Sequence, residues 1–236
     1  MLLLGYGRHA ITTGRPLLRL DLFRIRTFRC SVIGSFITRL GAGGTPFLLP
    51  LLYQVGLGFT PVQSGLLIMP QSLAAMSLKM TMPFILTRFG YRRVLLSNTI
   101  LLGLLIGLFA TIGFGTPVWL IVIQAFCFGF IASLQYTSMN TLVYADTTEE
   151  ETSAANSIFS TVQQMAISFG VATAGLATAF FIPNHAQSNP ALMIDGLHKA
   201  LFSLGILTML STIVFRSLKR RDGMAVSRQK AVHLEG

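Results

Sequence analysis

The sequence predicts an all-α membrane protein with six transmembrane helices. Hydrophobic residues make up 52% of the chain and charged residues only 11%, and the mean hydropathy is +0.66, whereas soluble domains average about 25% charged residues. Each predicted span is long enough for the roughly 20 apolar residues that cross a bilayer. Their length and their scarcity of charge favour helices over membrane β-strands, which alternate over about ten residues. The predicted spans are residues 30–55, 62–86, 94–114, 118–144, 154–182 and 197–215.

Basic residues are concentrated in the segments that join alternate spans. Residues 1–29, 88–93 and 216–236 contain Lys and Arg, whereas the loops on the opposite side contain none. This pattern obeys the positive-inside rule, with both termini in the cytoplasm. It predicts a cytoplasmic segment (1–29), a six-helix bundle (30–216) and a basic cytoplasmic tail (217–236). The net charge of +10 is therefore explained by topology and contact with membrane lipid, and no nucleic-acid partner is expected.

The first span, residues 30–55, carries a charge and helix-breaking residues. An arginine near the centre of a membrane helix costs about 2.5–3.5 kcal/mol on insertion scales, so Arg39 is expected to face protein or water. At 100° per residue, polar and small residues share one side of this helix with Arg39. We predict that Gly43, Pro46 and Pro50 bend the helix and that Arg39 and Gln54 line a cavity.

The second span, residues 62–86, contains a second cation, Lys79. Arg39 and Lys79 both lie roughly 13 Å from the cytoplasmic ends of their helices. The aspartates and glutamates of the chain all lie in loops, tails or helix ends. Either cation could instead extend its head group toward the interface. Otherwise a substrate anion or an acid from another helix bundle is expected to complete the site.

Small residues at four-residue spacing in the third and fifth spans, 94–114 and 154–182, are predicted to let these helices pack closely. The fourth and fifth spans also carry polar residues. Gln135 and Asn140 in the span 118–144, and Gln164 in the span 154–182, are predicted to line a polar pathway. The alternative is that they form hydrogen bonds between helices. The fifth helix is predicted to begin at a capping box formed by Thr148 and Glu151.

No pattern of catalytic residues indicates an enzyme. The chain lacks a G-x-S-x-G elbow, an H-E-x-x-H pair and a Walker loop. Cys30 and Cys127 have no metal-binding spacing. We therefore expect no enzymatic activity, no metal and no bound cofactor.

One short loop motif resembles a known family signature. "TRFGYRRVLL", residues 87–96, is similar to the cytoplasmic-loop signature of the major facilitator superfamily, roughly G-x-L-x-D-R-x-G-R-R. Thr87 replaces the aspartate of that signature and Pro83 its first glycine. The matching residues are Arg88, Gly90, Arg92 and Arg93.

Longer stretches narrow this resemblance. "RLGAGGTPFLLPLLYQVGLGFTPVQSGLLIMP", "SLK", "SMNTL" and "NS…QQMAISFGVA" resemble the fourteen-span drug:proton antiporters of the EmrB/QacA type, in their MdtD-like branch. The resemblance covers residues 17–221 and aligns with the last six spans of that family. In that branch an arginine before the Gly-rich stretch and the lysine of the second helix recur, at Arg39 and Lys79 here.

The resemblance implies the C-terminal six-helix bundle of a major facilitator fold. It implies a multidrug or small-solute efflux antiporter in the bacterial inner membrane, energised by a proton gradient and working by alternating access. Arg88, Gly90, Arg92 and Arg93 would then form a conformational-switch loop. The expected partners are a small amphipathic solute and an N-terminal bundle or a second copy of this chain. The alternative is a membrane assembly component, or a truncated fragment, that does not transport.

Overall fold

The computed structural model describes residues 20–182, 190–219 and 222. The side chains of Leu20, Lys79, Met80 and Pro83 are excluded from this description. Much of the predicted cytoplasmic segment 1–29, part of the outer loop and most of the tail 217–236 therefore lie outside the described residues.

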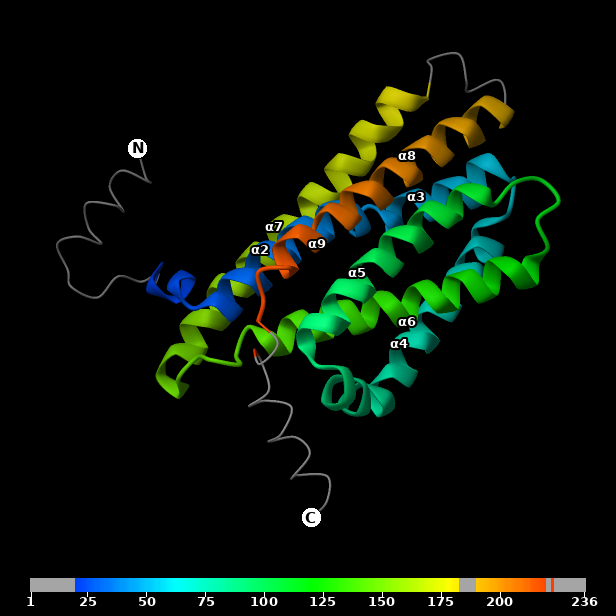
Figure 1. Cartoon of the computed structure of the whole chain (residues 1–236). Helices are drawn as coiled ribbons and strands as arrows, with labels where there is room; N and C mark the ends of the chain where they lie inside the picture. Colours follow the sequence, from blue (N-terminus) through cyan, green and yellow to red (C-terminus); the bar gives the residue numbers. More distant parts are fainter. Residues whose placement is uncertain (1–19, 183–189, 220–221, 223–236) are drawn as a thin grey trace, which may run out of the picture.

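The described residues form a bundle of helices without strands (Figure 1). Both described ends of the chain lie at one end of the bundle, as an even number of crossings requires. The elements are a 3-10 helix η1 (Leu20–Arg24), α2 (Arg26–Ala42), α3 (Thr45–Leu51), a π-helical turn η2 (Leu52–Gly56), α4 (Pro61–Phe89), α5 (Tyr91–Leu108), a 3-10 turn η3 (Phe109–Thr111), α6 (Val118–Leu142), α7 (Glu149–Phe181), α8 (Pro190–Leu210) and α9 (Thr212–Phe215).

The predicted all-α membrane fold is confirmed. Within the described residues, five helical segments are long and apolar enough to cross a membrane: Arg26–Gly56, Tyr91–Thr111, Val118–Leu142, Glu149–Phe181 and Pro190–Phe215. The remaining predicted span, 62–86, lies within α4, which has 29 residues and would extend about 43 Å. Helix α4 contains glutamine, serine and Lys79 among its apolar residues.

The first span is interrupted where the sequence places glycine and proline. Helix α2 ends at Ala42, Gly43 and Gly44 form the junction, and α3 follows with Pro46 in its first turn. Pro50 lies inside α3, and the helix widens into the π-helical turn η2 directly afterwards. Proline has no N–H for the helical hydrogen bond, so this half of the span departs from a regular α-helix.

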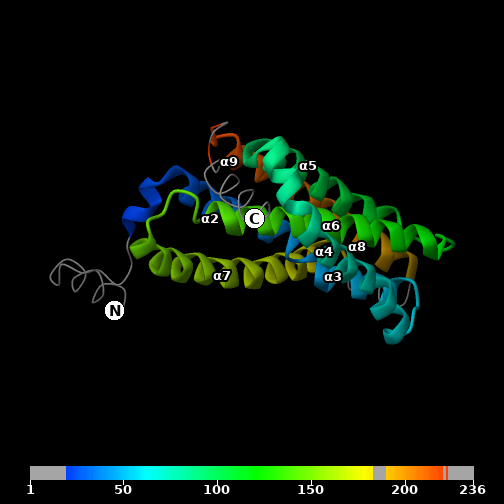
Figure 2. The same ribbon diagram turned by 90° about the horizontal axis from the view of Figure 1, so that it is seen from below.

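Close packing sets the order of the helices across the bundle (Figures 1 and 2). Helix α2 packs against α7 and α8, α4 packs against α6, and α5 packs against both α6 and α8. Buried leucine, isoleucine and phenylalanine side chains of α3, α5, α6 and α8 form the largest part of the core. Residues of α2, α3, α4, α6 and α7 surround a cavity with a mixed polar and apolar lining.

The predicted start of the fifth helix is confirmed. Thr148 is the N-cap of α7, and its backbone N–H donates a hydrogen bond to Glu151 Oε2 over 3.1 Å. Three glutamates occupy the first turn of α7, where the positive end of the helix dipole stabilises negative charge.

Candidate functional site

Arg39 lies deep in the bundle, near the C-terminal end of α2. Its side chain is 9% exposed, and its Nε donates a hydrogen bond to Ser35 Oγ one turn earlier, over 3.2 Å. Its guanidinium carbon lies 4.1 Å from the ring centroid of Tyr136 on α6. A guanidinium stacked on an aromatic face is stabilised by the ring quadrupole, more strongly where water is excluded. Arg39 therefore faces other helices of the bundle, as the sequence predicts.

Arg39 borders a cavity of about 440 Å³ among α2, α3, α4, α6 and α7. This volume lies within the range of about 300–1,000 Å³ that is typical of small-molecule sites. Small and apolar residues, including Phe128 and Ile167, make up much of the wall. The polar residues that line it are Arg39, Gln71, Ser72, Ser133, Tyr136 and Thr137.

Two glycines let the helices around the cavity approach one another. A Cβ added at Gly129 of α6 would lie 2.5 Å from Cα of Gln71 on α4, and one at Gly170 of α7 would collide with the carbonyl oxygen of Arg39. Real Cβ atoms do not tolerate such distances, because overpacking forces backbone shifts. These glycines therefore hold α4 and α7 in the positions that form the cavity walls.

The cavity holds a positive charge that has no carboxylate beside it in the described part of the chain. Among the described residues, the ion pairs join Arg24 to Asp21, Arg26 to Asp222 and Lys199 to Asp195. Arg39 is in none of them. Gln71 also lines the cavity, and its Nε2 is buried without a hydrogen-bond partner in the part of the chain that the structure describes.

The structure distributes the sequence-predicted residues over several locations. Gly43 and Pro46 line the cavity with Arg39, whereas Pro50 and Gln54 are half-buried outside its lining. Lys79 belongs to α4, but its side chain lies outside the described residues.

The predicted polar residues of α6 and α7 lie outside the cavity lining. Gln135 is fully buried between α5 and α6, where it accepts a hydrogen bond from Asn98 Nδ2 over 3.0 Å and donates to Thr99 Oγ1 over 2.8 Å. Asn140 accepts a hydrogen bond from Gln163 Nε2 over 2.9 Å, and Gln164 is exposed on α7. For Gln135 and Asn140, the structure therefore shows hydrogen bonds between helices, which was the alternative to lining a polar pathway.

The sequence prediction did not include Gln71, Ser72 or Tyr136, which are among the polar residues of the cavity. The signal for Tyr136 was its spacing from Ser133: residues three apart are neighbours on a helix surface. No comparable signal identified Gln71, since its position depends on how α4 packs against Gly129.

The loop between α4 and α5 has the tight geometry that its glycine permits. Gly90 ends α4 and begins α5 with φ +74° and ψ 154°, a conformation that is essentially restricted to glycine. Arg92 Nε is buried and has no hydrogen-bond partner among the described residues. The guanidinium carbon of Arg88 lies 5.8 Å from the ring centroid of Phe84. Arg93 is exposed.

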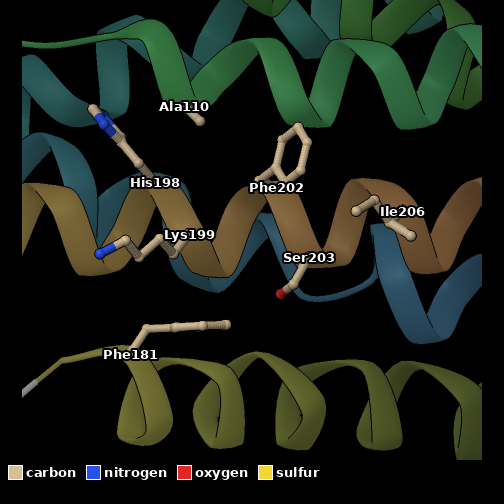
Figure 3. Close-up of a pocket in the computed structure, with 7 residues that line it drawn as sticks. All are labelled: Ala110, Phe181, His198, Lys199, Phe202, Ser203 and Ile206. Carbon is tan, nitrogen blue, oxygen red and sulfur yellow. The ribbon is translucent and has the colours of Figure 1, made fainter.

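A second pocket, of about 480 Å³, lies between the C-terminal end of α7 and the N-terminal half of α8 (Figure 3). Phe181 of α7 faces the α8 side chains there, and Phe202 and Ile206 add to a largely apolar wall. Lys199 Nζ donates to Asp195 Oδ2 over 2.6 Å, and His198 Nε2 donates to the Ile112 carbonyl oxygen over 2.8 Å. Because its polar groups already have partners, this pocket is a weaker candidate for recognising a polar solute.

A cluster of polar contacts ties the two ends of the described chain together. Arg26 donates two hydrogen bonds to Asp222, of 2.6 Å and 3.0 Å, and Thr27 Oγ1 donates to Asp146 Oδ2 over 2.8 Å. Burial alone would raise the pKa of Asp222, but hydrogen bonds from Arg26 and the Lys219 backbone outweigh it and hold that pKa below its usual value.

Comparison with known proteins assigns the chain to a family. The sequence profile of the Major Facilitator Superfamily matches residues 7–171, which is more than half of the chain. The chain belongs to the Major Facilitator Superfamily. This membership and the long apolar helices make it an integral membrane protein of a transporter family.

The relatives of this major facilitator chain support the branch indicated by its sequence. The chain is 33% identical to a Pectobacterium atrosepticum protein named "Putative multidrug resistance protein MdtD" over 213 residues, which are 90% of this chain and 46% of that protein. It is 34% identical to proteins of the same name from Escherichia fergusonii and Escherichia coli K12, over 95% of this chain and 48% of each relative. The chain thus spans about half the length of the curated relatives it matches, and the resemblance to the MdtD-like branch is confirmed.

Proposed function

We propose that this six-helix bundle forms one half of a secondary active transporter that exports small amphipathic solutes. In this proposal the bundle works against a second bundle and alternates between inward-open and outward-open states. The second bundle is either the half present in the longer relatives or a second copy of this chain. The observation that carries the proposal is the cavity of about 440 Å³, largely apolar but bordered by buried Arg39. Multidrug resistance in the names of the relatives supports export as the direction of transport.

We further propose that the energy comes from a proton gradient. The described helices carry their carboxylates at helix ends, as in the first turn of α7 and at Asp195 near the start of α8. A proton-carrying acid deep in the membrane would therefore come from the second bundle. The positive-inside pattern supports a bacterial inner-membrane location with both termini in the cytoplasm.

The test is solute flux in proteoliposomes. The purified chain alone is compared with the chain co-purified with the half of the Escherichia coli relative that this chain does not cover. Under an imposed proton gradient, we expect flux only from the two-bundle assembly, and we expect a protonophore to abolish it. Proton-driven flux from the monomeric chain alone would refute the half-transporter proposal. So would the absence of flux from a stable assembly over a panel of amphipathic solutes.

A further inference from the structure

The geometry points to the cavity around Arg39 as a binding site for the anionic end of an amphipathic solute, a carboxylate or a similar oxyanion. This inference rests on the proposed transport function and specifies the chemical class of solute at the same site.

The first argument is the charge of Arg39. The side chain is more than nine-tenths buried, yet among the described residues it has one hydrogen bond, to Ser35, and no ion pair. A buried cation normally has a hydrogen-bonded partner of opposite charge, because removal from water costs several kcal/mol per ion. The guanidinium has five N–H donors, and a single Ser35 contact leaves most of them available.

The second argument is that the contact with Tyr136 leaves the donors of Arg39 without an anionic partner. The guanidinium carbon lies over the Tyr136 ring, 4.1 Å from its centroid. Among the described residues the hydrogen bond of the Arg39 side chain is the one to Ser35, so the other N–H groups of its planar fork remain available to a solute. That planar fork matches the two oxygens of a carboxylate.

The third argument is that further polar residues line the same cavity. Gln71 is one of them, and its Nε2 is buried and has no hydrogen-bond partner among the described residues. The lining also includes the hydroxyl groups of Ser133 and Thr137. A buried amide nitrogen without a partner costs free energy, which an oxyanion in the cavity would offset. Arginine and amide N–H groups together suit an acceptor, not a cation.

The fourth argument is the rest of the wall. Phe128, Ala132 and Ile167 border the same space, so the apolar body of a solute has a surface to contact. A cationic solute of the same shape would approach Arg39 with like charge and would offer its donors no acceptor. The cavity is therefore predicted to select by charge as well as by shape.

The test uses three probes of similar shape and different charge: 2-naphthoate, 2-naphthamide and 2-naphthylmethylammonium. Binding to the full chain is measured by calorimetry in nanodiscs of phosphatidylcholine, with empty nanodiscs as the blank. We expect the naphthoate to bind about tenfold or more tightly than the other two, as a charge-assisted hydrogen bond would give. Equal binding of the three probes, or tighter binding of the ammonium, would overturn the inference without using any variant.

Variants locate the site. Arg39→Gln is expected to weaken naphthoate binding about tenfold to a hundredfold and to leave naphthamide binding unchanged. Arg39→Lys should bind naphthoate with intermediate affinity, because lysine keeps the charge but lacks the planar fork of guanidinium N–H donors. Lys199→Gln is the matched control, since it removes a cation outside the cavity and should bind naphthoate as wild type does. Equal naphthoate binding by Arg39→Gln and wild type, at equal elution volume in size-exclusion chromatography, would overturn the inference.

A last arm separates the two sources of a carboxylate, a solute and an acid of the second bundle. Naphthoate binding is measured again on the two-bundle assembly described above. If the assembly still binds naphthoate and binding still depends on Arg39, the cavity is a solute site. If binding is lost on assembly, an acid of the partner bundle fills the site at Arg39, and the inference is overturned. Transport of cationic solutes without naphthoate binding would refute this inference alone, while naphthoate binding without any flux would refute the proposed function.

Discussion

The contact between Arg39 and Tyr136 gives a prediction whose magnitude follows from the structure. The guanidinium carbon lies 4.1 Å from the ring centroid, and Arg39 is 9% exposed. Cation–π contacts contribute about 0.5–1 kcal/mol at exposed sites and about 2 kcal/mol or more when they are desolvated. Because Arg39 is buried, we expect the contact to contribute about 2 kcal/mol. A contribution of that size would change the folding equilibrium about thirtyfold.

A double-mutant cycle isolates this contact from the packing of the ring. Tyr136→Leu is made in wild type and in Arg39→Gln, and the free energy of unfolding is measured by titration with sodium dodecyl sulfate in mixed micelles. We expect Tyr136→Leu to cost about 2 kcal/mol more in wild type than in Arg39→Gln. Tyr136→Phe keeps the ring and should retain the coupling. An equal loss from Tyr136→Leu in both backgrounds would refute the stacking argument.

Three further predictions follow from the helix contacts. Gly170→Val should lower the free energy of unfolding by about 1–3 kcal/mol, because its side chain would collide with the Arg39 carbonyl oxygen; Gly175→Ala, with open space around its Cβ, is the control. Gly90→Ala should cost about 1–3 kcal/mol, because φ is +74° there, and a chevron or titration midpoint equal to wild type would contradict this. The lowered pKa of Asp222 means that its contribution to stability is present above the unfolded-state pKa and is lost as pH falls through the folded-state pKa. Asp222→Asn should therefore reduce thermal stability at pH 7 but not at acid pH, and an equal reduction at both would contradict the assignment.

The sequence predicted the elements of this fold well, because the signals for them are local. Apolar runs of transmembrane length became helices, and the Thr148–Glu151 capping box begins α7 as expected. The helical period also related Arg39, Gly43 and Pro46, which together border the cavity. Each of these inferences needs only the geometry of one helix.

The remainder of the site depends on contacts between helices, which one sequence does not specify. A polar residue on a helix can face a cavity or a neighbouring helix, and the helical period does not distinguish the two. Gln135 forms hydrogen bonds with Asn98 and Thr99 of α5. The ring of Tyr136, the next residue, contacts the guanidinium of Arg39 instead. Gln71 reaches the cavity because Gly129 allows α4 to approach α6. These outcomes are set by packing distances.

The central claim is that the Arg39 cavity is the solute path of a proton-driven transporter. Its most direct test is proton-gradient-driven flux of a solute that the two-bundle assembly transports, compared among wild type, Arg39→Gln and Lys199→Gln at equal protein abundance in proteoliposomes. We expect Arg39→Gln to lower the flux about tenfold or more and Lys199→Gln to retain the wild-type flux. Equal flux from wild type and Arg39→Gln would contradict the claim.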